Sequence, residues 1–211
     1  MPVLTPPFGH GSTDPAGHRR KTLKRYIITG TPGAGKTTIL RCLEALGHSV
    51  VDEAATAVIA SEQARGEAEP WAHPSFVDKI IALQRQRQTD APATAIQFYD
   101  RSPICTHALS TYLGYPSSPA LSTEIERITR EGVYERQVFF VRNLGFCEPT
   151  AARRISFEDS LEFERVHEES YQLFGYELVG IPAGEPADRA AAITNAISRL
   201  DGENRLATGI S

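Results

Sequence analysis

The chain has 211 residues, of which 41% are hydrophobic and 23% are charged, fractions typical of a globular protein. This length favours one domain with a sizeable core. The composition, together with the length, excludes collagen, a wholly disordered chain and a miniprotein that needs disulfide staples. The net charge of −4 argues against general nucleic-acid coating, so we expect no nucleic-acid partner. No apolar run approaches the length of a membrane span, so we expect none.

Strand and helix patterns alternate along the chain from residue 26 to residue 200. The expected strands are Tyr26–Thr29, Ser49–Val51, Ala95–Tyr99, Gln137–Val141 and Glu177–Ile181. The expected helices are Lys36–Leu46, Glu53–Arg65, Pro74–Asp90, 103–113, 121–131, Phe157–Phe174 and Pro186–Leu200. Five strands alternating with helices predict an α/β fold, a parallel sheet with helices on both faces. Its ligands should bind at the carboxyl ends of the strands.

The two ends of the chain differ from this pattern. We expect a flexible basic leader over 1–24, one domain over 25–200 and a flexible tail over 201–211. The basic cluster His18–Arg25 favours a solvated segment, and contact with an acidic partner or a membrane surface is the alternative. The three cysteines are scattered and form no CxxC pair, which fits reduced thiols in the cytoplasm. The sequence does not decide the oligomeric state, and a homodimer is one possibility.

The strongest motif is GTPGAGKT, Gly30–Thr37, which matches GxxxxGK[ST] between an expected strand and an expected helix. Its glycines let backbone N–H groups face phosphate oxygens, and the helix that follows directs its positive end at the same anion. Lys36 should reach the β- and γ-phosphates, and the Thr37 hydroxyl should hold Mg²⁺. The expected phosphate-binding residues are Gly30, Pro32, Gly33, Ala34, Gly35, Lys36, Thr37 and Thr38.

A phosphate loop normally works with a carboxylate at the end of a neighbouring strand, which organises Mg²⁺. Two places in the chain offer one. Asp52 and Glu53 end the second expected strand, and Asp100 ends the third. We favour Asp100 as the metal-organising acid, because Asp52 and Glu53 come only one helix after the phosphate loop. The chain contains no NKxD guanine-reading motif and no LSGGQ signature, which disfavours a Ras-like GTPase and an ABC ATPase.

Asp100-Arg101-Ser102 resembles the motif that ends the third strand of thymidylate and deoxynucleoside kinases. The layout of residues 25–198 also resembles a P-loop family of AAA-type ATPases. That family contains the bacterial nicotinamide riboside kinase domain and the eukaryotic translocation-defect GTP-binding proteins. The resemblance lies in ITGTPGAGKTTIL (Ile28–Leu40), VVDEAATAVIASEQARG (Val50–Gly66), Gln84–Gln86, YDRSPICTHALSTYLG (Tyr99–Gly114) and SFEDSLEFERVHEESYQLFGYELVGIP (Ser156–Pro182).

The resemblance implies a three-layer, nucleoside-kinase-like fold that binds ATP and Mg²⁺. It implies that Asp52 or Glu53 binds an acceptor hydroxyl or acts as a base, and that Asp100 holds Mg²⁺ through water or competes for the base role. Arg101 would neutralise the transferring phosphate or grip the acceptor. Arg153 and Arg154 match the position of a kinase lid, where guanidinium groups close over the phosphates.

Each of these residues also has a simpler interpretation. Asp52 and Glu53 fit a helix N-cap, Asp100 and Arg101 a buried structural ion pair, and Arg153–Arg154 a solvated surface. Trp71 and Phe76 fit either an acceptor pocket or the core. The departures from the family pattern lie in Glu67–Pro74 and in the arginine-free segment 143–150.

The expected activity is transfer of the ATP γ-phosphate to a hydroxyl of an unidentified small molecule, such as a nucleoside. The alternative is a nucleotide-binding ATPase or GTPase switch without a small acceptor.

Overall fold

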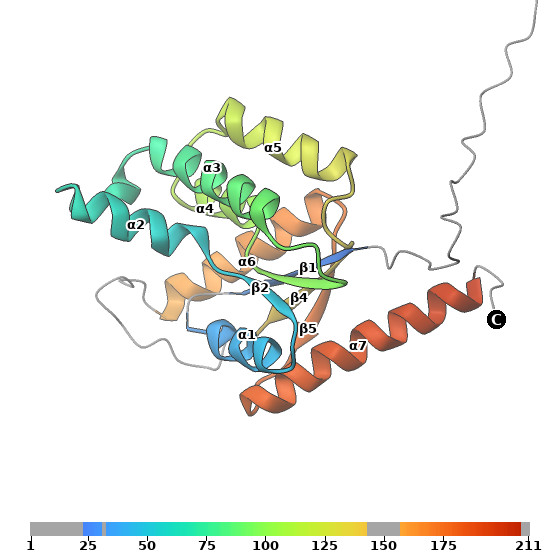
Figure 1. The fold of residues 1–211 in the computed structure, drawn as a ribbon. Helices are drawn as coiled ribbons and strands as arrows, with labels where there is room; N and C mark the ends of the chain where they lie inside the picture. The colour runs from blue at the N-terminus through green and yellow to red at the C-terminus, as the bar shows by residue number, and fades with distance from the viewer. Residues whose placement is uncertain (1–22, 31–32, 143–156, 208–211) are drawn as a thin grey trace, which may run out of the picture.

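The computed structural model describes residues 23–30, 33–142 and 157–207, with the side chains of 157 and 204–207 left out (Figure 1). The strands are β1 (Lys24–Thr29), β2 (Ser49–Val51), β3 (Ile96–Asp100), β4 (Gln137–Val141) and β5 (Glu177–Ile181). The helices are α1 (Lys36–Ala45), α2 (Ala54–Ala64), α3 (Ser75–Asp90), α4 (Pro103–Tyr112), α5 (Pro119–Arg130), α6 (Phe157–Leu173) and α7 (Pro186–Ala207), with a 3₁₀ turn η1 (Pro70–Ala72).

All five strands are parallel and lie in the order β2-β3-β1-β4-β5. The phosphate-binding segment therefore follows a central strand with a neighbour on each side. Because Ile28 of β1 is in register with Asp100 of β3, the end of β3 lies beside the start of the phosphate loop. The Arg101 N–H donates to the Ile28 carbonyl at 3.0 Å and continues this pairing past the strand.

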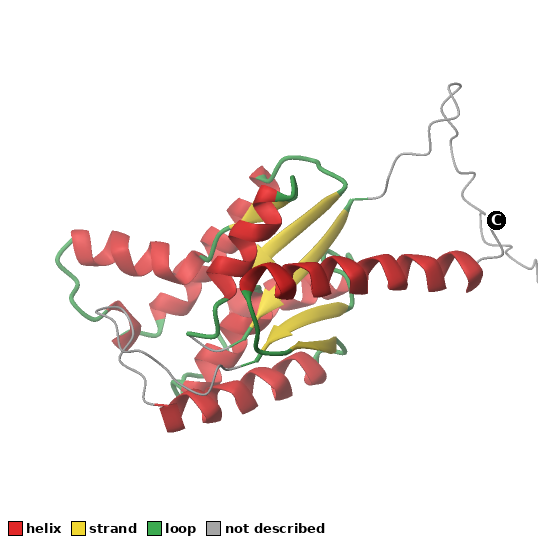
Figure 2. Cartoon of the chain, turned by 90° about the horizontal axis from the view of Figure 1, so that it is seen from below, coloured by secondary structure: helices red, strands yellow, loops and turns green. Residues whose placement is uncertain are grey.

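Two apolar layers enclose the sheet, and successive β1 residues alternate between them as the pleat requires. Tyr26 and Ile28 pack with α1 and α7 on one face, whereas Ile27 packs with α3, α4, α5 and α6 on the other. Figures 1 and 2 show α1 and α7 together on one side of the sheet and the remaining helices on the opposite side. This arrangement is the expected α/β fold with helices on both faces.

A third, smaller cluster joins α2 to α3 at the edge of the molecule. Ala54 and Val58 of α2 pack on Phe76 and Ile80 of α3, and Trp71 of η1 packs against the same group. Glu62 of α2 pairs with Lys79 of α3, which links the two helices on their outer side. Helices α2 and α3 and the turn η1 thus lie beside the carboxyl ends of the strands.

Most expected elements lie within two residues of the observed ones, and the two ends of the domain differ. Strand β1 begins at Lys24, inside the expected leader, because the Lys24 N–H pairs with the Ala95 carbonyl at 3.0 Å. Helix α7 continues to Ala207, so residues 201–207 of the expected tail are helical. Asp201 on this extension forms an ion pair with Lys24, which ties the two ends together. Residues 1–22 and 208–211 lie outside the described structure.

The turn η1 was not expected, because three residues carry no periodicity that the sequence could reveal. None of the helices in the described part of the chain combines the length and the apolar character that crossing a membrane requires.

Candidate active site

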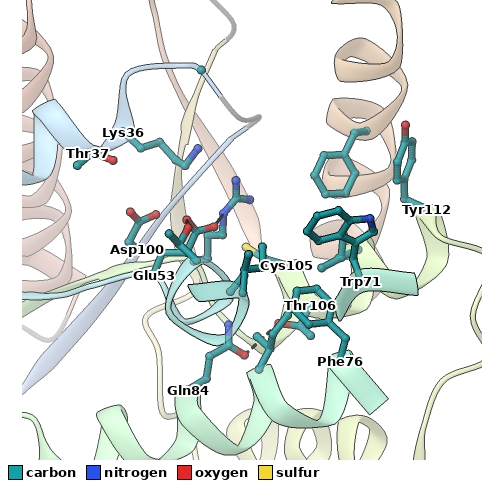
Figure 3. A pocket seen from close by; sticks show the side chains of 18 of the residues that line it. Lys36, Thr37, Glu53, Trp71, Phe76, Gln84, Asp100, Cys105, Thr106 and Tyr112 are labelled. Carbon is teal, nitrogen blue, oxygen red and sulfur yellow. Dashed lines mark hydrogen bonds and ion pairs between the residues drawn. The ribbon is translucent and has the colours of Figure 1, made fainter. Parts of the chain in front are cut away.

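A pocket of about 760 Å³ lies at the carboxyl ends of the strands. In Figure 3 Lys36 and Thr37 lie at one end of the pocket with Glu53 and Asp100 beside them, while Trp71, Phe76 and Tyr112 lie at the other end. The pocket therefore has a charged end beside the phosphate loop and an apolar end beneath α2 and η1.

The phosphate loop occupies the turn between β1 and α1, as its pattern predicts. Gly30 has φ 135°, and a Cβ atom built there would lie 2.3 Å from the Val141 carbonyl oxygen, so no other residue fits. Gly33 and Gly35 also have positive φ and line the pocket, together with Lys36, Thr37 and Thr38. Ala34 is buried, and its carbonyl accepts a hydrogen bond from Arg189 of α7 at 2.9 Å. Pro32 lies outside the described residues.

Lys36 is the first residue of α1, and its side chain lies in the charged end of the pocket. Its ammonium group donates to the Gly30 carbonyl at 2.9 Å. Burial and the neighbouring Arg101 lower the pKa of Lys36 to about 8, although Asp100 and Glu53 oppose this shift. A bound phosphate would stabilise the charged form of Lys36, because its negative charge compensates for the hydration that the buried ammonium group has lost.

Of the two adjacent acids after β2, only Glu53 lines this pocket. The Asp52 side chain is 70% exposed and lies 3.9 Å from Arg41 of α1, outside this pocket. The Glu53 carboxylate pairs with Arg101 and accepts from the Thr56 hydroxyl at 2.8 Å. Glu53 occupies the N-cap position of α2, yet its side chain makes no capping hydrogen bond to that described helix.

The backbone around these acids is fixed from α3. Arg87 donates to the carbonyls of both Asp52 and Glu53 at 2.8 Å, which holds the turn between β2 and α2. Burial would raise the pKa of Glu53, but the charges of Arg101 and Lys36 outweigh burial and lower this pKa. Glu53 is therefore an ionised carboxylate that faces the pocket at neutral pH.

Asp100 ends β3 and also lines the pocket. Its Oδ1 atom is buried and accepts no hydrogen bond from any residue that the structure describes. Burial and the nearby Glu53 raise the pKa of Asp100, while Lys36 and Arg101 oppose them. A buried carboxylate oxygen without a donor is an energetic cost that a bound cation or an ordered water would relieve.

The described residues contain no cluster of three or more His, Cys, Asp or Glu side chains that could enclose a metal. Mg²⁺ in phosphate sites is commonly held by one or two protein groups, with phosphates and water completing its shell. The orphaned Asp100 oxygen and the Thr37 hydroxyl, both in the pocket wall, fit such a partial site.

Arg101 is the one described non-glycine residue with positive φ, 71°. Left-handed backbone at such a residue costs free energy that the surroundings must offset. Here the side chain is 12% exposed, pairs with Glu53 of the β2–α2 turn and meets His167 of α6 at 3.3 Å. The ion pair that Arg101 forms is thus with Glu53, whereas the simpler interpretation of the sequence had paired it with Asp100. Arg153 and Arg154 lie outside the described residues.

Aromatic side chains form the other end of the pocket. Trp71 and Phe76 line it while also packing in the cluster between α2 and α3, so they belong to the pocket wall and to the core at once. Tyr112 of α4 and Phe163 of α6 line the same end, with ring centroids 4.9 Å apart. The Thr106 hydroxyl donates to Gln84 at 3.0 Å between the two ends (Figure 3).

Several pocket residues carried no role in the sequence interpretation, namely Gln84, Thr106, Tyr112, Phe163 and, behind Arg101, His167. All five lie inside the quoted resemblance segments, and that was their only signal. Their contribution depends on how α3, α4 and α6 pack together, which no local pattern encodes.

This fold and this loop define a P-loop NTPase. The model of a family described as an AAA domain matches residues 25–189, so the chain belongs to that family. A comparison with curated proteins finds no match.

Solved structures with a similar fold include three kinds of protein. NadR in complex with NAD and AMP-PNP is 18% identical with a TM-score of 0.60, and the match covers 85% of this chain and 50% of NadR. The chain thus spans about half the length of NadR. Deoxyadenosine kinase from M. mycoides with bound dATP is 16% identical with a TM-score of 0.56, and the match covers 83% of this chain and 99% of the kinase. Shikimate kinase from Acinetobacter baumannii in complex with shikimate is 17% identical with a TM-score of 0.52, and the match covers 85% of this chain and 96% of the kinase.

Proposed function

We propose that the protein is an ATP- and Mg²⁺-dependent kinase that transfers the γ-phosphate to a hydroxyl group of a small molecule. The observation that carries this proposal is the shared pocket. It joins the phosphate loop and Lys36 to the ionised carboxylate of Glu53, and it extends beyond them into an aromatic end. A nucleotide hydrolase without an acceptor has no need for that second end.

In the proposed reaction the acceptor oxygen attacks the γ-phosphorus, and the bond from phosphorus to the bridging β-oxygen breaks, leaving ADP. The hydroxyl proton passes to Glu53, which orients the oxygen more than it activates it, because phosphoryl transfer requires little activation of the nucleophile. Lys36 and Arg101 face the charge that develops on the transferring group. Mg²⁺ held by Thr37 and Asp100 would neutralise the β- and γ-phosphates.

The ion pair between Glu53 and Arg101 keeps both groups charged in the absence of substrate. An acceptor hydroxyl that enters between them can donate to the carboxylate and face the guanidinium at the same time. The pair is therefore preorganised for a neutral hydroxyl and for the anion that the hydroxyl becomes.

The apolar end supports an acceptor with a planar or apolar part. Trp71, Tyr112 and Phe163 supply ring faces, and Gln84 and Thr106 supply polar groups between these rings and Glu53. Among proteins with a similar fold, NadR has been solved in complex with NR, deoxyadenosine kinase with bound dATP, and shikimate kinase with shikimate. Among these shapes a nucleoside-like ring suits an aromatic wall better than a small carboxylic acid does. We therefore propose a nucleoside-like acceptor.

The test is ADP release from Mg²⁺-ATP with and without a panel of nucleosides, ring-bearing alcohols and hydroxy acids. We expect ADP only with an acceptor, and a product heavier by one phosphate group. Glu53→Gln should lower turnover by about 100-fold or more, within the range of general-base variants. Asp52→Asn is the matched control and should change turnover less than about twofold, because its carboxylate is exposed.

Tight nucleotide binding without acceptor-dependent ADP across the whole panel would reject the kinase and leave the nucleotide switch. Equal losses in the two acid variants would reject the role given to Glu53.

A further inference from the structure

A fully buried histidine lies directly behind Arg101. His167 of α6 has no solvent exposure, and its Nε2 atom lies 3.3 Å from Nη1 of Arg101. It belongs to none of the motifs that mark the phosphate loop or the acids. In the sequence it stands within an acid-rich helix, between Glu164 and Glu168.

The hydrogen bonds of His167 decide which of its nitrogens carries the proton. Nδ1 lies 2.9 Å from the Phe163 carbonyl, which can only accept a hydrogen bond, so Nδ1 must be protonated. The guanidinium of Arg101 can only donate. Nε2 must therefore keep its lone pair, and the ring is neutral. Both contacts are satisfied only in this form.

The neutrality of the ring matters for the charge of Arg101. A carboxylate behind the guanidinium would fix its direction but cancel part of its charge. A neutral imidazole acceptor fixes the direction and leaves the charge available to an anion in the pocket. Arginine has five N–H donors, so contacts at Nη1 and toward Glu53 leave others for a phosphate.

We propose that His167 is a positioning residue, whose Nε2 lone pair holds the guanidinium of Arg101 in the direction needed for the transferring phosphate. This inference rests on the proposed kinase function. Arg101 needs such support because its backbone has φ 71°, an unfavourable conformation that leaves the side chain to be held by its contacts. Glu53 and His167 hold it from two different elements, the β2–α2 turn and α6.

The same face of α6 reaches the acceptor end of the pocket. The Phe163 ring lies one helical turn before His167, packs on it edge to face at 4.3 Å and lines the pocket beside Tyr112. A shift of α6 would therefore move the acceptor wall and the support of Arg101 together. Positioning of the two ends is coupled through this one helix.

The first test reads the histidine itself and needs no turnover. Long-range ¹H–¹⁵N spectra of the nucleotide-free protein should show His167 protonated at Nδ1, whereas a neutral histidine side chain in water prefers a proton at Nε2. The ring should stay neutral at about pH 5, below the ordinary histidine pKa of about 6.5. The reason is that burial, the charge of Arg101 and, to a smaller extent, Lys36 lower the pKa of His167 to about 3. The hydrogen bond to the Phe163 carbonyl and the charge of Glu53 raise this pKa, but by less. Arg101→Met should shift the Nε2 resonance. A proton on Nε2, or no response to Arg101→Met, would overturn the proposal whether or not the protein is a kinase.

The second test uses turnover with the acceptor found above. His167→Leu keeps an apolar side chain but no acceptor and should lower kcat on the order of tenfold, with KM for ATP changed less than about twofold. His167→Gln restores an acceptor oxygen and should recover most of the rate. In an Arg101→Met background, His167→Leu should have no further effect.

The matched control is His107 of α4, whose Nδ1 meets Ser170 of α6 at 3.1 Å without any contact to Arg101. His107→Leu should leave kcat within about twofold. A loss equal to that of His167→Leu, or additive losses of His167→Leu and Arg101→Met, would show that α6 packing alone is responsible and would overturn the proposal. If His167→Leu does not fold, the comparison of His167→Gln with the wild type and the spectra decide the question.

Discussion

Raising the pH from 7 to 9 should weaken ATP binding about tenfold through the titration of Lys36. The nucleotide-free protein holds this side chain in a buried position beside Arg101, where its pKa is about 8. A triphosphate in the loop restores the ammonium form, because opposite charge raises the pKa of a lysine. Above pH 8 the complex therefore binds more protons than the free protein, and the affinity falls as the pH rises.

The magnitude follows from the protonated fraction. With a pKa of about 8, Lys36 is about nine-tenths charged at pH 7 and about one-tenth charged at pH 9. Since only the charged form binds tightly, the apparent dissociation constant rises by the ratio of these fractions, about tenfold or about 1.4 kcal/mol. Each ATP bound at pH 9 should take up about 0.9 of a proton. The terminal phosphate, with a last pKa of about 6, stays ionised over this range.

Isothermal titration calorimetry with Mg²⁺-ATP at pH 7, 8 and 9 measures both quantities, when it is repeated in buffers of different ionisation enthalpy. Lys36→Met removes the titrating group, so it should bind more weakly at pH 7 and show neither the pH slope nor the proton uptake. A wild-type affinity that stays constant from pH 7 to 9 would refute the reasoning, as would the same slope in Lys36→Met.

Three further changes test other parts of the structure. Gly30→Ala should lower the free energy of unfolding by about 2–4 kcal/mol in denaturant titrations, because its Cβ meets the Val141 carbonyl. The control Gly47→Ala has φ 88° but open space around its Cβ, so it should lower the free energy of unfolding by only about 1–2 kcal/mol. Equal losses in the two variants would contradict this account. Asp100→Asn should lower Mg²⁺-dependent ADP release about 100-fold or more, and an unchanged rate and Mg²⁺ requirement would reject the metal role. Tyr171→Phe removes a hydroxyl that lies 2.9 Å from two buried polar side chains, so thermal unfolding should show a loss of about 1–2 kcal/mol, and an unchanged midpoint would count against that network.

The fold was largely predictable because its signals are local. Each strand is a short, largely apolar run that ends at or just before a polar residue, a glycine or a proline, and each helix carries its own period. Ser49–Val51, Gln137–Val141 and Glu177–Ile181 were therefore placed to the residue. The end of α7 was missed because the Lys24–Asp201 pair, which supports the helix there, joins residues far apart in the sequence. Strand order, set by long-range pairing, was not predictable from these local signals.

The part of the site formed by one continuous segment was predictable. The part formed by residues that are distant in the sequence and meet only through packing was not. Gly30–Thr37 carries its own turn, helix start and lysine, so its location needs no tertiary information. The choice between Asp52 and Glu53 needs the twist of the turn after β2, which Arg87 of α3 fixes from a distance. His167 acts only because α6 packs against α4, and nothing local in its acidic helix marks it.

The strand order has a consequence for how the protein is made. Among the described strands, β1 pairs only with β3 and β4, and β2 pairs only with β3, so β1 and β2 are not paired with each other. During synthesis no strand of this sheet can find its native neighbour until residues 96–100 have left the ribosome. Until then the apolar central strand presents two open edges, the condition under which chains aggregate or recruit chaperones. The phosphate loop therefore exists as a sequence well before it exists as a site, and destabilising changes in β3 should reduce the yield of folded protein more than comparable changes in β5.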